Sequence, residues 1–493
     1  MRGGLMVCGT TSDAGKSHVV TGLCRLLSRR GVRVAPFKAQ NMALNSFVTP
    51  SGHEIGRAQG VQALAAGVDP EVAMNPILLK PTGERTSQVV LNGKPLAHMT
   101  AAEYHEAKPS LLATVLDALA DLRRRFDVVI VEGAGSPAEI NLLDHDIVNL
   151  RVASEAGLPA IVVGDIDRGG VFAALYGTVA LLPDHYRSLV RGFVINKFRG
   201  DPALLGDGLA DLERRCGVPT LGVLPFVHDV ALDAEDSLAL TGRRPQATGP
   251  ARGDALDIAA IHFPRLSNFT DLDALALEPG VGVRLVDDAA ALGSPDLVIL
   301  PGTKATVADL DWLRGRGLDR AVLATDALVL GVCGGLQMMG RRIEDDVESG
   351  RGVVDGLGWL DVETRFGPDK VTLQRRGVCM GQRVTGYQIH HGRVHGGVGW
   401  VHLDDAYGAE DDGAVEPAEA RFLGTTLHGL FESDGFRAAF LTELGRRRGK
   451  TFVPAGVSFP AARRAQFDRL ADLLEAHLDL TALDALIKEG APA

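Results

Sequence analysis

The fold of the first half of the chain is decided by residues 9–17, which read Gly9-Thr10-Thr11-Ser12-Asp13-Ala14-Gly15-Lys16-Ser17. An apolar run at residues 5–9 leads into this stretch and an amphipathic pattern at residues 15–30 follows it, which predicts a strand, a loop and a helix. Small residues in such a loop let backbone N–H groups face a phosphate, and the helix N-terminus adds partial positive charge. The standard pattern has glycine where this chain has Thr10. The stretch still predicts a nucleoside triphosphate site.

The polar residues of this loop have expected roles. Lys16 reaches the terminal phosphates, and the hydroxyl of Ser17 binds Mg²⁺. Asn196 ends the apolar run 192–196 and is a candidate for reading the nucleotide base, although asparagine at a strand end is often a turn residue. The expected nucleotide contacts are Thr10, Thr11, Asp13, Gly15, Lys16, Ser17 and Asn196.

Carboxylates end two further apolar runs. Glu132 follows residues 127–131, and Asp165 follows residues 160–164. Ligands of an open α/β sheet gather at the carboxyl ends of its strands. We therefore expect Glu132 to be a Mg²⁺ ligand opposite Ser17. For Asp165 a role in capping the next turn is an equal alternative.

Apolar runs alternate with amphipathic helices in both halves of the chain, and the alternation restarts after a polar segment rich in Gly and Pro. This pattern predicts an α/β protein with two doubly wound parallel-sheet domains. The expected divisions are a P-loop nucleotide-binding domain at residues 1–240, a linker at 241–253, a second domain at 254–445, and a helical segment at 446–493 packed on the second domain.

The composition excludes several classes of protein. A net charge of -11 argues against a nucleic-acid backbone or an anionic membrane as the main partner. The five cysteines are scattered, which argues against a disulfide framework and against a zinc site. The chain has no apolar run of bilayer length and no secretory signal pattern at its start. We expect a cytoplasmic protein.

A second motif lies at residues 331–335, which read Gly331-Val332-Cys333-Gly334-Gly335 at the end of an apolar run. A Gly-x-Cys-x-Gly elbow places the sulfur at the apex of a tight strand-to-helix turn, exposed to a cleft. Cys333 is therefore the predicted nucleophile, whereas the other four cysteines have the pattern of small buried apolar residues. The N–H of Gly334 is one expected oxyanion donor, and Gly302 in the Pro-Gly-Thr-Lys stretch 301–304 is the other.

The base that serves this cysteine is expected to be a histidine far away in the sequence. His428, at the end of an apolar run, is the best candidate. His390 and His391 are its competitors.

These features together resemble known enzymes. The Cys333 elbow, residues 301–304 and His428 resemble a class I glutamine amidotransferase domain, which implies a flavodoxin-like fold. The shifted phosphate loop and Glu132-Gly133-Ala134-Gly135 resemble dethiobiotin-synthetase-like ATPase domains. Their order in one chain resembles the corrinoid amidating enzymes, and among these the cobyric acid synthases. Marker segments lie at residues 36–46, 55–59, 74–81 and 386–390, and the likeness runs from residue 5 to about residue 474.

The resemblance implies a glutamine- and ATP·Mg²⁺-dependent ligase of cobalamin biosynthesis. Such an enzyme amidates the b, d, e and g carboxylates of adenosylcobyrinic acid a,c-diamide to give adenosylcobyric acid. ATP makes a carboxyl phosphate, and ammonia from glutamine attacks it. The alternatives are a cobyrinic acid a,c-diamide synthase, a relative that acts on a cell-wall lipid carboxylate, or a P-loop ATPase scaffold with an inactive amidase-like domain. The expected partners are glutamine and a corrinoid polycarboxylate, and the oligomeric state is left open.

The resemblance also implies roles for particular residues. Cys333 is the nucleophile and His428 is its base. In the wider amidotransferase pattern a glutamate follows the histidine by two residues, but position 430 is leucine here. Glu432 is the candidate replacement, and a Cys–His dyad is the alternative that we favour. The candidates for binding the acidic corrin are Lys38, Gln40, Asn41, Asn45, Arg57 and Lys80, with Gln59 and Asn75, and a solvated loop is the alternative for each.

Overall fold

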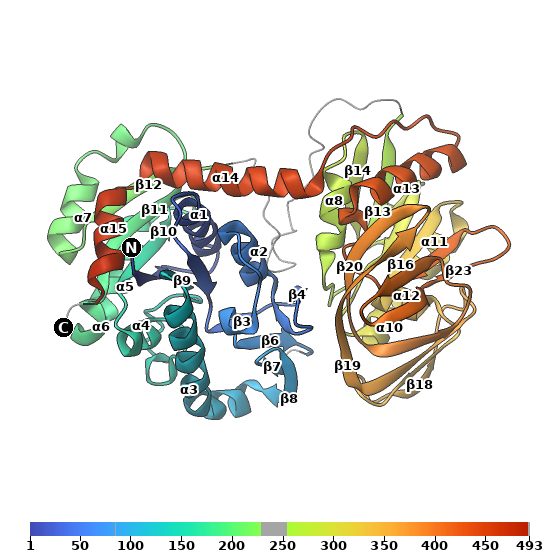
Figure 1. Cartoon of the computed structure of the whole chain (residues 1–493), viewed down its shortest axis with the longest axis horizontal. Coiled ribbons are helices and arrows are strands. Elements are labelled where there is room, and N and C mark those ends of the chain that lie inside the picture. Colours follow the sequence, from blue (N-terminus) through green and yellow to red (C-terminus); the bar gives the residue numbers. More distant parts are fainter. Residues whose placement is uncertain (84, 228–253, 492–493) are drawn as a thin grey trace. The chain divides into compact units, whose positions relative to one another are not determined.

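The computed structural model describes residues 1–83, 85–227 and 254–491, and the chain forms two compact units (Figure 1). Within the described residues, unit 1 contains residues 1–43, 53–83, 85–227 and 463–491, and unit 2 contains residues 44–52 and 254–462. The expected linker at residues 241–253 lies outside the described residues.

Unit 1 is built on a six-stranded parallel sheet with the strand order β12-β11-β10-β1-β9-β2. Leu5 and Val7 of β1 share a buried core with side chains of α1, α14 and α15, whereas Met6 and Cys8 pack on the opposite face with side chains of α3, α4 and α5. Both faces are therefore covered by helices, which explains why the central positions of β1, β9 and β10 are apolar on both faces. The strands are β1 (Gly3–Gly9), β2 (Val34–Phe37), β9 (Val128–Glu132), β10 (Ala160–Asp165), β11 (Val190–Phe198) and β12 (Thr220–Pro225).

A second, smaller sheet in unit 1 has the order β3-β6-β7-β8. Its strands are β3 (Gln40–Met42), β6 (Ile77–Pro81), β7 (Thr86–Leu91) and β8 (Lys94–Thr100), and β5 (Glu54–Gly56) precedes α2. The helices of unit 1 are α1 (Lys16–Arg29), α2 (Arg57–Ala66), α3 (Ala101–Arg125), α4 (Leu150–Ala156), α5 (Val171–Leu181), α6 (Asp184–Arg187), α7 (Gly208–Cys216), most of α14 (Phe459–His477), and α15 (Leu480–Glu489).

The C-terminal helices correct one expectation. We predicted that residues 446–493 pack on the second domain, but residues 463–491 belong to unit 1. Leu474 of α14 is buried in the same core as α1, and the N–H of Asp479 donates to the carbonyl of Leu221 in β12 at 2.7 Å. Arg25 of α1 pairs with Asp468 of α14 at 2.7 Å. The apolar stripe predicted the helices, but it could not specify which sheet they cover.

Unit 2 also contains a mostly parallel sheet, with the order β14-β13-β15-β16-β24-β23. Its five parallel strands follow the sequence order 2-1-3-4-5, which is that of flavodoxin-like folds. Ile258 and Ala260 pack with α8 and α13, whereas Ala259 and Ile261 pack with α10, α11 and α12. The predicted α/β class with two doubly wound domains is confirmed.

The parallel strands of unit 2 are β13 (Leu256–Ile261), β14 (Val281–Val286), β15 (Leu297–Leu300), β16 (Leu328–Val332) and β24 (Phe422–Thr425), and β23 (Ala414–Val415) is antiparallel. The helices are α8 (Asp273–Ala276), α9 (Ala289–Leu292), α10 (Thr306–Gly315), α11 (Leu318–Ala324), α12 (Gly334–Met339) and α13 (Asp434–Arg447). A second sheet contains β17 (Arg342–Asp345), β18 (Gly352–Asp355), β19 (Val362–Cys379), β20 (Gln382–Gly396), β21 (Val401–Asp405) and β22 (Gly408–Asp412). In Figure 1 the long strands β19 and β20 curve across this unit.

A short part of the expected first domain also differs from the prediction. Residues 44–52, which include β4 (Ser46–Val48), belong to unit 2. The N–H of Ser46 donates to Oδ1 of Asn268 at 3.0 Å, and Nε2 of Gln374 donates to the carbonyl of Val48 at 2.7 Å. The first domain is therefore not one continuous stretch that ends at residue 240, because residues 44–52 belong to unit 2.

Among the described residues, none of the helices combines the length and apolar character that a membrane span requires.

Candidate active sites

The phosphate loop lies between the end of β1 and the start of α1, as predicted from the sequence. Gly15 has φ 102°, and a Cβ there would lie 2.0 Å from Nδ2 of Asn196, so the loop can approach β11 only with glycine at this position. Nδ2 of Asn196 donates to the carbonyl of Ala14 at 2.9 Å. In this structure the side chain of Asn196 holds the loop through this hydrogen bond. Its contact with a nucleotide base stays a prediction.

Lys16 lies over this loop. Its Nζ donates to the carbonyl of Thr11 at 3.0 Å and to that of Gly135, after β9, at 3.1 Å. The N–H of Thr10 donates to Val163 in β10 at 2.9 Å, so this residue anchors the loop to the sheet instead of offering its N–H to a phosphate. Asp13, with φ 58°, forms the exposed tip of the loop. The loop therefore holds one ammonium group above the helix N-terminus, where a phosphate would bind.

Glu132 is the centre of a buried polar cluster at the end of β9. Its Oε1 accepts hydrogen bonds from Oγ of Ser17 at 2.9 Å and from Nζ of Lys38 at 3.0 Å, and its Oε2 accepts one from Nε2 of Gln62 at 2.5 Å. Burial works to raise the pKa of Glu132, but Lys38, Gln62 and Lys16 outweigh it and hold the pKa below its ordinary value. The group is therefore a carboxylate beside a hydroxyl. These are the hard oxygen ligands that Mg²⁺ prefers, so Ser17 and Glu132 fit the predicted metal role.

The residues predicted to bind the corrin are mostly buried rather than solvated. Three amides, those of Asn41, Gln59 and Asn75, surround Gly56, where a Cβ would lie 2.4 Å from Nδ2 of Asn41. The Nδ2 of Asn41 donates to Oε1 of Gln59 at 3.0 Å. The structure therefore excludes the alternative of a freely solvated loop for these three residues, because each is at most 1% exposed.

The other corrin candidates differ in position. Nζ of Lys80 pairs with Oε1 of Glu54 at 2.6 Å, and both are buried. Oε1 of Gln40 accepts a hydrogen bond from the hydroxyl of Tyr104 at 2.7 Å. Unit 1 contains Lys38, Gln40, Asn41, Arg57 and Lys80, whereas Asn45 belongs to unit 2. Their role in binding substrate stays a prediction.

Cys333 forms the predicted elbow between β16 and α12. Its φ of 50° and ψ of -105° are unusual for a residue with a side chain, and such strain is found at functional sites. A Cβ at Gly335 would lie 1.8 Å from the carbonyl of Leu300, so the turn tolerates no side chain there. We expected an exposed sulfur, but the residue is only 7% exposed. Cys333 is one of the groups that raise the pKa of His428, which distinguishes it from a cysteine that only fills a core.

His428 lies shortly after β24, and its imidazole contacts a carboxylate. Its Nδ1 lies 2.7 Å from Oδ2 of Asp271, while Oδ1 of Asp271 accepts a hydrogen bond from the N–H of Gly429 at 2.7 Å. The imidazole stacks on the ring of Tyr387, with centroids 5.2 Å apart. Burial works to lower the pKa of His428, but Asp271 and Cys333 outweigh it and raise the pKa to about 10. His428 is therefore an imidazolium at neutral pH and can give a proton to a departing group.

Asp271 corrects the expected third member of the site. We predicted either Glu432 or a Cys–His dyad. Nδ1 of His428 is bound by the carboxylate of Asp271, and Cys333 is another group that raises the pKa of this histidine. The structure therefore gives His428 a carboxylate partner other than Glu432. The sequence analysis missed Asp271, although one signal was present. It lies in the short helical turn Phe269–Leu272 that follows β13, at the same carboxyl edge of the sheet as the elbow.

Gly302 lies at the same edge, directly after β15. A Cβ at Gly302 would lie 2.8 Å from Cε1 of His428, and one at Gly334 would lie 2.8 Å from Cγ2 of Thr303. The loop 301–304 and the elbow therefore contact each other beside the base, as expected of two parts of an oxyanion site. Donation from Gly302 and Gly334 to an oxyanion stays a prediction.

Asp309 fixes this loop and provides a prediction of pH-dependent stability. It accepts hydrogen bonds from Oγ1 of Thr303 and, at 3.2 Å, from the N–H of Arg265. Burial raises the pKa of Asp309 to about 6, so folding favours its protonated form. The stability that this group contributes is fully present below the pKa of about 3.9 expected for the unfolded chain, and it is lost as the pH rises through about 6.

We therefore expect Asp309→Asn, which stays neutral, to gain stability relative to the wild type as the pH rises from about 4 to about 7. The gain is at most about 3 kcal/mol, since a tenfold change in proton affinity corresponds to about 1.4 kcal/mol. Urea unfolding of both proteins at several pH values measures it. A difference that stays constant with pH would contradict the burial of an ionisable group at this position.

His390 and His391 are not placed to act as the base. Burial, with help from Arg393, lowers the pKa of His390 to about 3, and burial also lowers the pKa of His391. Nδ1 of His391 lies 3.1 Å from the carbonyl of Gly367. Cys333 is among the groups that raise the pKa of His428, so the preference for His428 agrees with the structure.

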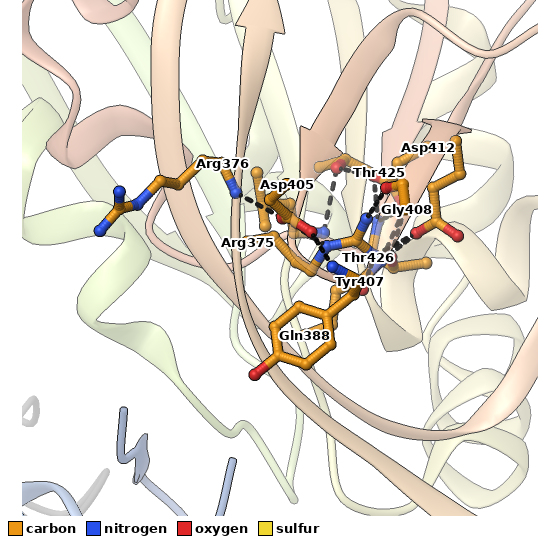
Figure 2. A network of polar contacts seen from close by, with 11 residues as sticks. Arg375, Arg376, Gln388, Asp405, Tyr407, Gly408, Asp412, Thr425 and Thr426 are labelled. Atoms are coloured by element: carbon orange, nitrogen blue, oxygen red, sulfur yellow. Dashed lines mark hydrogen bonds and ion pairs between the residues drawn. The ribbon is translucent and has the colours of Figure 1, made fainter. Parts of the chain in front are cut away.

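A network around Arg375 fixes the end of β24, just before His428. Figure 2 shows the guanidinium of Arg375 between Asp405 and Gln388, at 2.8 and 3.0 Å. Nε2 of Gln388 donates to the hydroxyl of Thr426 at 2.8 Å, and Asp412 accepts hydrogen bonds from Thr426 as well. The second sheet of unit 2 thus orients the strand that presents the base.

Comparison with known proteins assigns both units. Residues 5–239 match the model of the CobQ/CobB/MinD/ParA nucleotide binding domain. Residues 257–436 match the model of the CobB/CobQ-like glutamine amidotransferase domain. The first match covers the phosphate loop and Glu132, and the second covers Asp271, Cys333 and His428.

Relatives named cobyric acid synthase align along the whole chain. That of Rhodococcus jostii (strain RHA1) is 54% identical over 498 residues, which cover 100% of this chain and 96% of the relative. That of Streptomyces avermitilis is 53% identical over 502 residues, with 100% and 98% covered. That of Streptomyces coelicolor is 54% identical over 503 residues, again with 100% and 98% covered. The chain therefore belongs to the cobyric acid synthase family and is a glutamine-hydrolysing, ATP-dependent ligase.

Proposed function

We propose that this enzyme amidates the b, d, e and g carboxylates of adenosylcobyrinic acid a,c-diamide and produces adenosylcobyric acid in cobalamin biosynthesis. The main support is the identity of more than half of the residues, along the whole chain, to relatives named cobyric acid synthase. The geometry supports the division of labour, because one unit carries a phosphate loop and the other carries a Cys–His–Asp arrangement.

In the proposed glutaminase reaction, Sγ of Cys333 attacks the side-chain amide carbon of glutamine. His428 gives its proton to the departing nitrogen as the C–N bond breaks, which releases ammonia and leaves a thioester on Cys333. Water, deprotonated by the now neutral His428, then cleaves the thioester and releases glutamate. Asp271 holds the Nδ1 proton of His428 and stabilises the imidazolium, so it is a positioning residue.

In the proposed synthetase reaction, an oxygen of the substrate carboxylate attacks the γ-phosphorus of ATP and ADP departs. Ammonia then attacks the carboxyl carbon and phosphate leaves, which gives the amide. Lys16 offsets negative charge on the phosphates, and we propose that Lys38, whose Nζ pairs with Glu132, does the same for the transferred group. Mg²⁺ bound with ATP would be held by Ser17 and Glu132, and it supplies further neutralisation of phosphate charge.

The proposal is tested by mass spectrometry of candidate corrinoids after incubation with the enzyme, ATP, MgCl₂ and glutamine. Each conversion of a carboxyl to a carboxamide lowers the mass by about one unit. We expect four conversions of adenosylcobyrinic acid a,c-diamide and none of the product. Conversion of only the a and c carboxylates of cobyrinic acid would identify a different corrinoid ligase, and no conversion of any corrinoid would refute the proposal.

Lys16→Ala should lower amidation from either nitrogen source by about 10²- to 10³-fold, the usual cost of removing one preorganised charge partner. Its Nζ is the group held above the phosphate loop. Hydrolysis of glutamine alone should persist, because Cys333 and His428 belong to the other unit. Corrinoid mass spectrometry and glutamate release measure the two effects. Equal loss of both reactions in a folded variant would contradict the division of labour.

A further inference from the structure

Asp412, the last residue of β22, is buried and binds the stretch of chain that leads from β24 to His428. Its Oδ2 accepts hydrogen bonds from Oγ1 of Thr425 at 2.5 Å and from the N–H of Thr426 at 3.1 Å. Its Oδ1 accepts hydrogen bonds from Oγ1 of Thr426 and, at 3.4 Å, from Nε2 of Gln388. Figure 2 shows Asp412 in one network with both threonines. One carboxylate therefore fixes two consecutive residues just before the base.

Thr425 connects this carboxylate to the nucleophile as well as to the base. Its carbonyl accepts a hydrogen bond from the N–H of Cys333 at 2.8 Å. Its Oγ1 accepts one from the N–H of Leu427, the residue before His428, at 3.0 Å and donates its own hydrogen to Asp412. The backbone beside both reacting side chains is therefore held through Thr425, and Asp412 holds Thr425.

A second connection to the same stretch comes from β20. Tyr387 and His428 exchange two backbone hydrogen bonds, at 3.0 and 2.9 Å. The next residue, Gln388, donates to Oγ1 of Thr426 at 2.8 Å. Two strands of the second sheet thus hold the chain on either side of the base, and Asp412 is the only charged group that contacts it from β22 among the described residues.

The surroundings of Asp412 do not favour a charge. All of its hydrogen-bond donors are neutral, and within the described part of the chain no Lys or Arg pairs with it. Burial raises the pKa of Asp412, and the hydrogen bonds from Thr425 and Thr426 oppose this effect without cancelling it. A buried carboxylate without a cation costs folding free energy. Such a group is more typical of a functional site than of a core built for stability.

We propose that Asp412 is a positioning residue of the glutaminase reaction, which sets the separation of Cys333 and His428 through Thr425. A carboxylate suits this task because its two oxygens can accept hydrogen bonds from all four donors around it. A carboxamide has only one acceptor oxygen, and its NH₂ group would face another donor. The inference rests on the proposed function, because it requires that Cys333 and His428 carry out glutamine hydrolysis.

The experiment compares Asp412→Asn, Thr425→Val and Thr425→Ser with the wild-type protein. Valine keeps the shape of threonine without the hydroxyl, whereas serine keeps the hydroxyl. Asp296→Asn is the matched control, because Asp296 is also a buried carboxylate of unit 2 but precedes β15 at the opposite edge of the sheet, where it pairs with Arg448 and Lys450. Glutamate release is measured at varied glutamine concentration with ATP, MgCl₂ and adenosylcobyrinic acid a,c-diamide present, and urea unfolding verifies that each protein is folded.

We expect kcat to fall about 10- to 100-fold in Asp412→Asn and Thr425→Val, since a displacement of about 1 Å between reacting groups can cost 10²-fold. KM for glutamine should change less than about twofold, because the network ends at the groups that react after binding. Thr425→Ser and Asp296→Asn should keep kcat within about twofold of the wild type. The proposal is overturned if Asp412→Asn keeps the wild-type kcat, if Thr425→Ser loses as much as Thr425→Val, or if Asp296→Asn loses as much as Asp412→Asn. Should Asp412→Asn not fold, the serine and valine variants decide alone.

Cys333→Ala in the same assay separates this proposal from the proposed function. Glutamate release that persists in folded Cys333→Ala would contradict the glutaminase reaction itself. An inactive Cys333→Ala together with a fully active Asp412→Asn would overturn only the positioning role.

Discussion

Replacement of Cys333 by alanine should abolish amidation driven by glutamine and leave amidation driven by ammonium salts at the wild-type rate. The sulfur is the only atom of the residue that can form the thioester, and removal of a catalytic nucleophile costs on the order of 10⁶-fold in kcat. The ammonium-driven reaction needs only the phosphate loop and the carboxylate substrate. Glutamate release and corrinoid mass spectrometry, with each nitrogen source in turn, measure the two rates.

The strained backbone at Cys333 affects the choice of control. Alanine adopts the φ of 50° no more readily than cysteine, so Cys333→Ala keeps the geometry of the elbow and removes only the sulfur. Cys379→Ala is the matched control, because Cys379 is completely buried in the same unit and hydrogen-bonds only weakly, to the carbonyl of Trp400 at 3.6 Å. Cys379→Ala should keep glutamine-driven activity. Loss of the ammonium-driven reaction in folded Cys333→Ala would show that the sulfur has a role outside glutamine hydrolysis.

The parts of the two sites that the sequence predicted well are local. The phosphate loop at residues 9–17 and the elbow at Cys333 each require glycines within a few residues of the reactive group, because the backbone must turn sharply there. The structure places both at the carboxyl ends of parallel strands, as the strand–loop–helix pattern predicted. The position of Glu132 was predictable because it ends an apolar run that reads as a strand. The structure pairs that strand with β1.

The parts that the sequence did not predict depend on contacts between distant segments. Asp271 lies 157 residues from His428, and only the strand order brings the ends of β13 and β24 to one edge of the sheet. The amphipathic pattern at residues 459–486 predicted helix but not the sheet that it covers. Likewise, the polar residues near Asn45 indicated a functional segment but gave no sign that residues 44–52 are built into unit 2.

Asp271→Asn should lower the kcat of glutamine hydrolysis by about 10³- to 10⁴-fold, the cost found when the carboxylate of a catalytic triad becomes an amide. The carboxylate contributes the largest of the effects that raise the pKa of His428 to about 10 against the opposing effect of burial. Without it, burial prevails and the pKa falls, so His428 is neutral at pH 7. The sulfur then lacks its cation, and an amide at position 271 can also stabilise the wrong ring tautomer.

The matched comparison for Asp271→Asn is Glu432→Gln, which should change the rate less than about twofold, since the carboxylate bound to Nδ1 of His428 is that of Asp271. Alkylation of Cys333 by a glutamine analogue gives a second measurement. Alkylation should be slower in Asp271→Asn than in the wild type, because the carboxylate that stabilises the imidazolium of His428 is lost. If Glu432→Gln gave the larger loss of activity and the slower alkylation, the third group of this site would be the glutamate and not the aspartate.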